Sequence, residues 1–230
     1  MTFARRSAEG QRRGGDVPAS VHDELRRAQE IGALGPGDID EHITHAAGFL
    51  EAIAAVDPGA PRGPRHVLDL GAGGGVPGLV IAALAPTWTV TLLDGRTERI
   101  RHLVDAIERL GWSDRVATVA MRAEEAAHRV DLRFAFDAAV ARAFASPPVT
   151  AECGAGFLRP GGYLVVSDPP DGDPGRWPSA GLAELGLVRV ALPSLSRAFS
   201  VMQAENPCSE RFPRRVGIPA KRPLFGADRP

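Results

Sequence analysis

The stretch LDLGAGGGVPG, residues 68–78, holds five glycines in eleven positions. An apolar run at 66–70 leads into the glycines and predicts a buried strand, and the residues from Pro77 onward predict a helix. Proline suits the first helical turn, where its missing N–H costs nothing. A glycine-rich turn between a strand and a helix places backbone N–H groups at the carboxyl edge of a parallel sheet, where open α/β folds hold ligands. This turn is therefore the first candidate for a binding site.

Short apolar segments alternate with amphipathic segments along most of the chain. Over 97–110 the apolar residues recur at the i, i+3, i+4, i+7 spacing of one buried helix face. The predicted strands are 66–70, 89–94, 115–121, 137–142, 162–168, 186–194 and 197–205, and the predicted helices of this region are 77–84, 97–110 and 147–158. Only Leu195 and Ser196 separate the last two strands, so these should pair antiparallel at one edge. The pattern predicts an α/β fold with a Rossmann-like, mostly parallel seven-stranded sheet, an antiparallel edge hairpin and helices on both faces.

Composition divides the chain into four parts. We predict a disordered basic N-terminal arm at 1–20, a helical segment at 21–61 with helices at 21–34 and 38–56, a ligand-binding domain at 62–206 and a basic C-terminal tail at 207–230. Residues 1–15 carry a net charge of +3 and the tail carries +4, which leaves −8 for the rest because the total is −1. Basic ends on an acidic body indicate arms that touch a polyanion, but short basic ends also serve solubility.

No apolar segment approaches the ~20 residues that a membrane helix requires. The start, MTFARRSAEGQRRGG, has basic residues without the apolar stretch of a signal sequence. The two cysteines, Cys153 and Cys208, lack the spacing of metal ligands. We therefore expect a cytoplasmic protein and no metal site.

Asp94 ends the second predicted strand, about 20 residues after the glycine-rich turn. An acidic side chain at that place can bind both hydroxyls of a ribose. The chain has no G-x-x-x-x-G-K-[ST] phosphate loop, and the glycine spacing departs from the dinucleotide fingerprint. The turn together with Asp94 predicts a cofactor that contains a nucleoside. The alternative is that Asp94 only caps the helix beginning near Thr97.

At these residues the chain resembles the class I S-adenosylmethionine-dependent methyltransferases. Within that class, the segments DLGAGGGVPG, LLDGRTERIRHL, RAEE, VARAFA and FPRRVGIPAKRPL are similar to those of the GidB or RsmG family, which methylates N7 of a guanine in 16S ribosomal RNA. The resemblance covers residues 40–170 and reappears at 211–224, as in a divergent member. It implies that 62–206 is a methyltransferase domain that binds S-adenosylmethionine, and that the partner is 16S rRNA or the small ribosomal subunit.

The resemblance also implies which residues form the site. These are Gly71, Gly73 and Val76 for the methionine and ribose, Asp94 for the ribose, Ala123 and Glu124 for the adenine, and Arg142, at the mouth, as both a cofactor contact and the catalytic residue. Two alternatives stay open, since Glu124 can be a solvated charge and Arg142 can form a structural ion pair.

The chemistry of methyl transfer is compatible with a site that has few catalytic groups. The reaction is an in-line displacement, so binding and alignment supply much of the acceleration. Guanine N7 carries a lone pair in its neutral form and requires no general base. An oxygen acceptor would require one, and His42 and His45, at i and i+3 on the preceding helix, are the candidates. The alternative is that both histidines pack over the sheet.

Departures from the family bear on the substrate. The family's Asn-Leu-Thr segment is not recognisable, its Arg-His pair is Glu41-His42 here, and its Lys-Gly after the fifth strand is replaced by SDPPDGDPGRWP. Loss of a cation near the entrance argues against a phosphate-rich acceptor. Four basic residues of the tail partly restore the positive charge. The alternative is that they belong to a C-terminal strap and are solvated. These are Arg214, Arg215, Lys221 and Arg222. Three functions remain: an RNA methyltransferase, a methyltransferase for a small molecule, and a cofactor-binding protein without catalysis.

Overall fold

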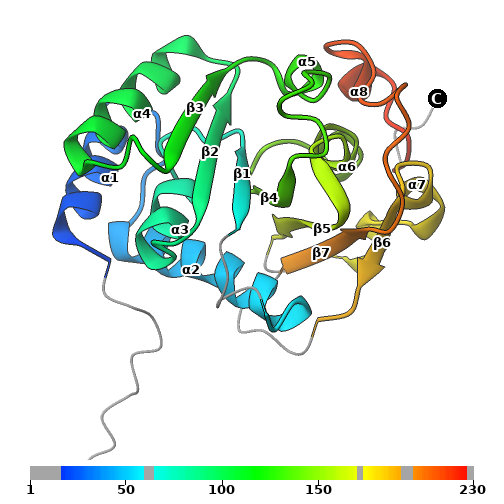
Figure 1. The fold of residues 1–230 in the computed structure, drawn as a ribbon, viewed down its shortest axis with the longest axis horizontal. Coiled ribbons are helices and arrows are strands. Elements are labelled where there is room, and N and C mark those ends of the chain that lie inside the picture. Colours follow the sequence, from blue (N-terminus) through cyan, green and yellow to red (C-terminus); the bar gives the residue numbers. More distant parts are fainter. Residues whose placement is uncertain (1–16, 60–64, 170–172, 193–198, 227–230) are drawn as a thin grey trace, which may run out of the picture.

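The computed structural model describes residues 17–59, 65–169, 173–192 and 199–226. They form one seven-stranded sheet with helices on both faces (Figure 1). The strands are β1 His66–Leu70, β2 Thr89–Asp94, β3 Val116–Ala120, β4 Phe136–Ala141, β5 Leu158–Ser167, β6 Leu187–Val190 and β7 Phe199–Ala204. The helices are α1 Ala19–Glu30, α2 Ile39–Val56, α3 Gly78–Leu84, α4 Thr97–Leu110, α5 Ala123–Ala126, α6 Pro147–Ala155, α7 Ser179–Ala183 and α8 Ile218–Lys221, with a 3-10 turn, η2, at Pro174–Arg176.

The strand order is β3-β2-β1-β4-β5-β7-β6. Strands β1 to β5 pair in parallel, whereas β7 is antiparallel to both β5 and β6. The predicted sheet with its antiparallel edge is therefore confirmed, and the stretch 193–198 between β6 and β7 lies outside the described residues. The chain order reverses at β1, which pairs with β2 on one side and β4 on the other. Open α/β sheets bind ligands at the carboxyl ends of the strands at such a switch point.

Successive strand residues face opposite sides of the sheet, so two cores form. Val67 and Leu92 pack in the core covered by α2, α3 and α4. Their neighbours Leu68 and Leu93 pack in the opposite core, which α5, α6 and α7 cover. Burial on both faces explains why these strands read as almost continuous apolar runs in the sequence.

Several element boundaries differ from the predicted ones. The predicted arm lies outside the described residues up to residue 16, and α1 begins at Ala19. The first helix ends at Glu30 rather than at 34, because the N–H groups of Ala33 and Leu34 both turn back to the carbonyl of Ala28. The helices α5 and α8 span four residues each, too few to produce a periodic signal. Within the described residues, no helix has the length and apolar character required to cross a membrane.

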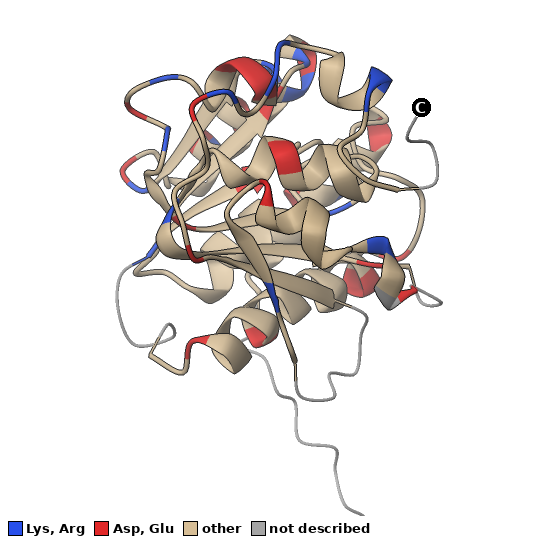
Figure 2. Cartoon of the chain, turned by 90° about the vertical axis from the view of Figure 1, so that its right-hand side faces the viewer, with Lys and Arg blue, Asp and Glu red and all other residues tan. Residues whose placement is uncertain are grey.

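Residues 207–226, within the predicted tail, pack against the domain. Phe212 and Phe225 belong to the core on the α6 side of the sheet. Figure 2 looks onto the side of the molecule that carries α7 and α8, where basic and acidic residues are interspersed. The C-terminal segment is therefore a folded part of this face over its described length.

Arg214 fastens this segment to α6. Its Nε and Nη2 atoms donate to the two carboxylate oxygens of Glu152 at 2.8 and 2.7 Å, and its backbone N–H donates to the same carboxylate at 2.8 Å. The Glu152 side chain is fully buried, and its hydrogen bond raises the pKa of Arg214. Arg214 is thus committed to an internal ion pair, whereas the neighbouring Arg215 is exposed.

This difference between adjacent arginines predicts a difference in stability. Arg214→Ala leaves the charge of Glu152 buried and unpaired, and should lower the free energy of unfolding by about 3–5 kcal/mol. Arg215→Ala is the matched control and should change it by less than about 0.5 kcal/mol. Urea denaturation followed by circular dichroism measures both. Small and equal losses would show that Glu152 does not depend on Arg214.

Candidate functional site

The glycine loop, residues 71–78, joins β1 to α3 and is tied to the end of β2. The N–H groups of Gly71 and Ala72 donate to the carbonyl of Leu93 at 2.8 and 2.9 Å. The N–H of Gly73 donates to Asp94 Oδ2 at 3.0 Å. Gly71 and Gly73 have φ angles of +80° and +54°, which favour glycine. The backbone therefore has the sharp turn that was predicted at the carboxyl edge of the sheet.

Most of these glycines are required by the protein's own packing. A Cβ atom at four of them would lie only 2.3–2.9 Å from other side chains. These contacts join Gly71 to Phe144, Gly74 to Ala28 and Leu34, Gly75 to Leu79, and Gly78 to Leu92 and Asp69. At Gly73 the nearest atom, the carbonyl oxygen of Ala33, would be 3.4 Å away. The turn after α1 therefore covers one part of the loop, and Phe144 covers another.

Asp94 is buried at the end of β2 and holds three donors. Its Oδ1 accepts from the N–H of Arg96 at 2.8 Å, and its Oδ2 accepts from Gly73 and from Arg99 Nη1 at 3.3 Å. Arg96 is the residue before α4, and its own side chain makes no cap bond to that helix. Asp94 thus fixes the glycine loop and the approach to α4 together. Arg99 was not among the predicted site residues.

Arg142 follows β4 and contacts the N-terminal helical segment. Its Nη2 lies 2.7 Å from Nδ1 of His42, and His42 Nε2 lies 3.2 Å from the carbonyl oxygen of Gly35. Because arginine only donates and a carbonyl only accepts, these partners assign to His42 the neutral tautomer with its proton on Nε2. The lone pair on Nδ1 is then occupied by Arg142. His45 packs its ring against Phe49 and Phe199.

Asp69 is a buried carboxyl at the switch point. Its Oδ2 accepts from the N–H of Gly78 at 2.7 Å, whereas Oδ1 is buried without a hydrogen-bond partner among the described residues, as is Nη1 of Arg142. Burial, aided by the charge of Asp94, raises the pKa of Asp69 to about 7 against the opposing effects of Gly78 and Arg142. Burial lowers the pKa of Arg142, and Asp69 opposes that shift. A charge inside an apolar strand is the sequence signal for Asp69, which was not among the predicted site residues.

Glu124 lies at the start of α5, next to the buried Ala123, and is itself only 5% exposed. Its Oε1 accepts from the N–H of Gly217 at 3.1 Å and from Arg122 Nη2 at 3.4 Å. Burial by itself raises the pKa of Glu124, but these hydrogen bonds and the charge of Arg122 outweigh it and lower the pKa. Glu124 is therefore not a solvated charge. Val76 packs in a small core beneath α1 and α2.

A cavity of about 300 Å³ opens beside Arg142, at the carboxyl ends of β4 and β5. Phe144 and Trp177 are among the side chains that line it. Asp168, from the acidic segment after β5, also lines it, but its carboxylate accepts from Arg176 Nη1 at 3.1 Å, from Trp177 Nε1 at 3.3 Å and from the hydroxyl of Ser200. Asp168, which belongs to the segment that replaces the family's Lys-Gly, thus fixes the side chains of one wall of this cavity.

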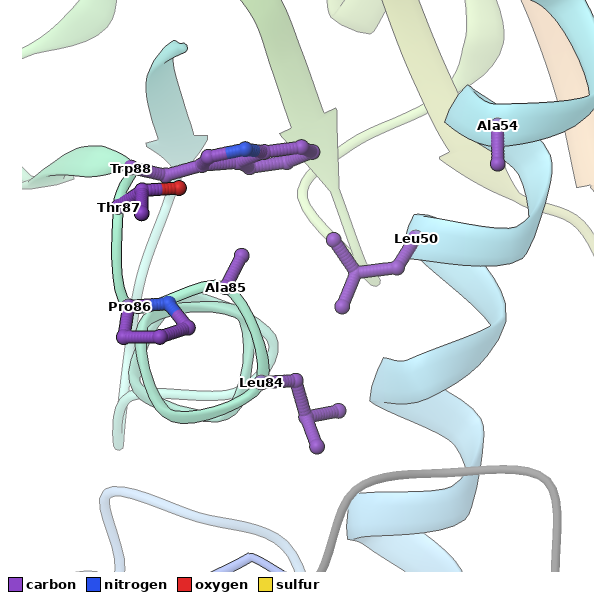
Figure 3. A pocket seen from close by; sticks show the side chains of 7 residues that line it. All are labelled: Leu50, Ala54, Leu84, Ala85, Pro86, Thr87 and Trp88. Atoms are coloured by element: carbon purple, nitrogen blue, oxygen red, sulfur yellow. The ribbon is translucent and has the colours of Figure 1, made fainter. Parts of the chain in front are cut away.

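A second pocket, of about 280 Å³, lies between α2 and the segment Leu84–Trp88, which leads into the amino end of β2 (Figure 3). It is at the opposite edge of the sheet from the glycine loop, which follows the carboxyl end of β1. Its lining is apolar apart from Thr87, with Leu50 and Ala54 contributed by α2. Among the described residues no titratable side chain lines it, so apart from the Thr87 hydroxyl they offer no group there for acid, base or nucleophilic chemistry.

Comparison with known proteins gives the same family as the sequence motifs. The family model GidB, described as rRNA small subunit methyltransferase G, matches residues 29–167. A relative named ribosomal RNA small subunit methyltransferase G from Parasynechococcus marenigrum (strain WH8102) is 36% identical over 185 residues, which cover 73% of this chain and 71% of the relative. A relative with the same name from Rubrobacter xylanophilus is 34% identical over 215 residues, or 87% and 79% of the two chains.

Among solved structures, the fold is similar to that of a putative sarcosine dimethylglycine methyltransferase from Galdieria sulphuraria. The TM-score is 0.55 at 18% identity, over 74% of this chain and 76% of the other. At that identity the similarity shows the class I methyltransferase fold alone. The sequence matches go further, because they cover most of the chain at more than 30% identity. The chain therefore belongs to the GidB family of rRNA small subunit methyltransferases.

Proposed function

We propose that this protein transfers the methyl group of S-adenosylmethionine to N7 of a guanine in 16S ribosomal RNA. The observation that carries the proposal is the family match over residues 29–167, which includes the glycine loop, Asp94 and Arg142. Relatives that match most of the chain are named for methylation of small-subunit ribosomal RNA. With ribosomal RNA or the small ribosomal subunit as its partner, the enzyme acts in the cytoplasm.

The polar groups at the switch point suit a cofactor that has an ammonium, a carboxylate and a ribose. The unpartnered Oδ1 of Asp69 is an acceptor for the ammonium, and the unpartnered Nη1 of Arg142 is a donor for the carboxylate. Asp94, beside Gly73, is the candidate acceptor for the ribose hydroxyls. We assign the remaining contacts to Gly71 and Val76 in the loop and to Ala123 and Glu124 at the adenine.

Bound at this place, S-adenosylmethionine supplies an electrophilic methyl group on a sulfonium. The residues of the chain then need only to bind, align and exclude water. His42 contributes by holding one side of the Arg142 guanidinium, so that the other side is left for the ligand. Because Nδ1 of His42 already accepts from Arg142, it is not available to take a proton from an acceptor. The arrangement favours an acceptor that carries its own lone pair, as guanine N7 does.

The acceptor base fits the cavity between the ends of β4 and β5. Arg142 lines this cavity and therefore stands between the proposed cofactor and the proposed acceptor. Phe144 and Trp177 add aromatic surfaces to the lining, and unpaired RNA bases are commonly recognised by stacking on aromatic rings. The acidic segment after β5 suggested a small-molecule acceptor, but the carboxylate of Asp168 is occupied within the protein. We therefore do not retain that alternative.

Methyl transfer to RNA tests the proposal directly. Purified enzyme with labelled S-adenosylmethionine should methylate small ribosomal subunits or naked 16S rRNA from a strain that lacks this activity, and mass spectrometry should identify 7-methylguanosine. A separate titration of cofactor binding serves as the control for folding. Cofactor binding without transfer to either form of RNA would contradict the proposed substrate.

Asp94→Asn tests the ribose contact. The variant loses a charge-assisted hydrogen bond while keeping an oxygen that can accept from the loop, so binding of S-adenosylmethionine should weaken by about 1.5–3 kcal/mol, roughly 10- to 150-fold. Calorimetric titration measures this affinity. Arg99→Gln, which removes a partner of Asp94 but no proposed ribose contact, should have a smaller effect. An unchanged dissociation constant for Asp94→Asn would place the ribose elsewhere.

Asp69 predicts a pH dependence of cofactor binding. Since its pKa is about 7, the free protein holds the carboxyl protonated below that pH, and an ammonium at Oδ1 requires the ionised form. Affinity should therefore rise by up to about tenfold per pH unit towards pH 7 and level off above it. Near pH 6, cofactor binding to the parent protein should release a proton from Asp69, which calorimetry can measure. Asp69→Asn should show neither the rise in affinity nor this proton release. A rise of equal slope in the variant would exclude Asp69 as the partner of the ammonium.

A further inference from the structure

A groove of about 490 Å³ lies next to the proposed acceptor cavity, between the start of α6, η2 and the segment that follows α8. Pro147 and Arg176 line both the groove and the cavity, so the two adjoin. The other walls include Pro148, Pro223 and Phe225, whose rings give the groove an apolar floor. The groove therefore lies between the cavity and the end of α8.

Lys221, the last residue of α8, lines this groove and is held there from two sides. Before α8, the N–H of Gly217 donates to the buried carboxylate of Glu124. After α8, the carbonyl of Arg222 accepts from Nη2 of Arg214 at 2.7 Å, and Arg214 is itself paired with Glu152. The position of Lys221 is therefore set by the core of the domain.

Lys221 is the free cation of the groove. It is exposed, and its ammonium has no ion pair among the described residues. Arg176 forms an ion pair with Asp168. Asp173 is the acidic residue of the groove, and its Oδ1 accepts from the N–H of Gly175 at 2.7 Å. An anion that enters the groove can therefore reach an unpaired ammonium, with the half-buried guanidinium of Arg176 at the junction with the cavity.

We propose that this groove binds the RNA strand that carries the target guanine, with Lys221 contacting a backbone phosphate next to that nucleotide. The inference rests on the proposed function, since it is the guanine in the acceptor cavity that brings the strand to the groove. A lysine contacts phosphate as a point charge, so it adds affinity and salt dependence without reading the sequence. Proline and phenylalanine rings offer apolar surface to the sugar and base of the neighbouring nucleotide.

Charge substitutions at Lys221 test the contact by RNA binding. Lys221→Gln should weaken binding of 16S rRNA by roughly three- to tenfold and reduce the slope of log K against log salt by about 0.7–0.9, whereas Lys221→Arg should keep both. Arg101→Gln is the matched control, because Arg101 is an exposed residue of α4, far from α8 (Figure 1), and should leave the slope unchanged. All variants should bind S-adenosylmethionine with the parent affinity.

Lys221 is the only lysine of the chain, so an amine-directed acetylating reagent reports on it without any substitution. Bound small subunits or 16S rRNA should slow acetylation of Lys221, as measured by mass spectrometry of its peptide. If the parent methylates RNA while Lys221 stays equally reactive and Lys221→Gln keeps the parent salt slope, the groove is not the RNA path and the proposed function stands. If the parent neither binds nor methylates RNA, the proposed function fails and this inference fails with it.

Discussion

Two buried carboxylates hold the glycine loop, one near each end. Asp94 accepts from the N–H of Gly73, and Asp69 accepts from the N–H of Gly78, where α3 begins. Buried charges are expensive unless they are paired, so these bonds fix the loop firmly. They also bring two acidic groups close together, and burial with the nearby charge of Asp94 raises the pKa of Asp69 to about 7. A positive group beside Asp69 would lower the cost of burying these charges, which supports the proposed contact with the ammonium of the cofactor.

The regular part of the fold could be predicted from local patterns. The helix at 97–110 and the strands at 66–70 and 89–94 have the bounds that periodicity indicated, since each element buries a face or both faces in a core. The functional contacts are different, because they join residues that are distant in the chain. Arg142 meets His42, 100 positions away, and Glu124 meets Gly217, 93 positions away. Spacing along a sequence contains no signal for such pairs.

Composition predicted a basic C-terminal tail, but it could not show which of the basic residues form internal ion pairs and which are exposed. Arg214 and Arg215 are adjacent and chemically identical, yet one lies against a fully buried glutamate and the other is exposed. The roles of the loop glycines could not be assigned from composition either. Their missing side chains were first explained by the close approach of a ligand. Packing against Phe144, Leu34 and Leu92 is an equally strict reason for a missing side chain. Both cases show that a residue type restricts the possible roles, and that the partner selects among them.

The groups of this site that could take a proton bear on the kind of acceptor. His42 offers its only lone pair to Arg142, and the carboxylate of Asp168 is shared among three donors. Asp69 has a pKa suited to a base, but it is buried beneath the glycine loop and is not among the residues that line the acceptor cavity. Within the described residues, the one carboxylate that lines that cavity, that of Asp168, already accepts three hydrogen bonds, which supports the proposed acceptor that needs no base. A hydroxyl acceptor would have to lose its proton without help, whereas a neutral ring nitrogen with a lone pair attacks as it stands.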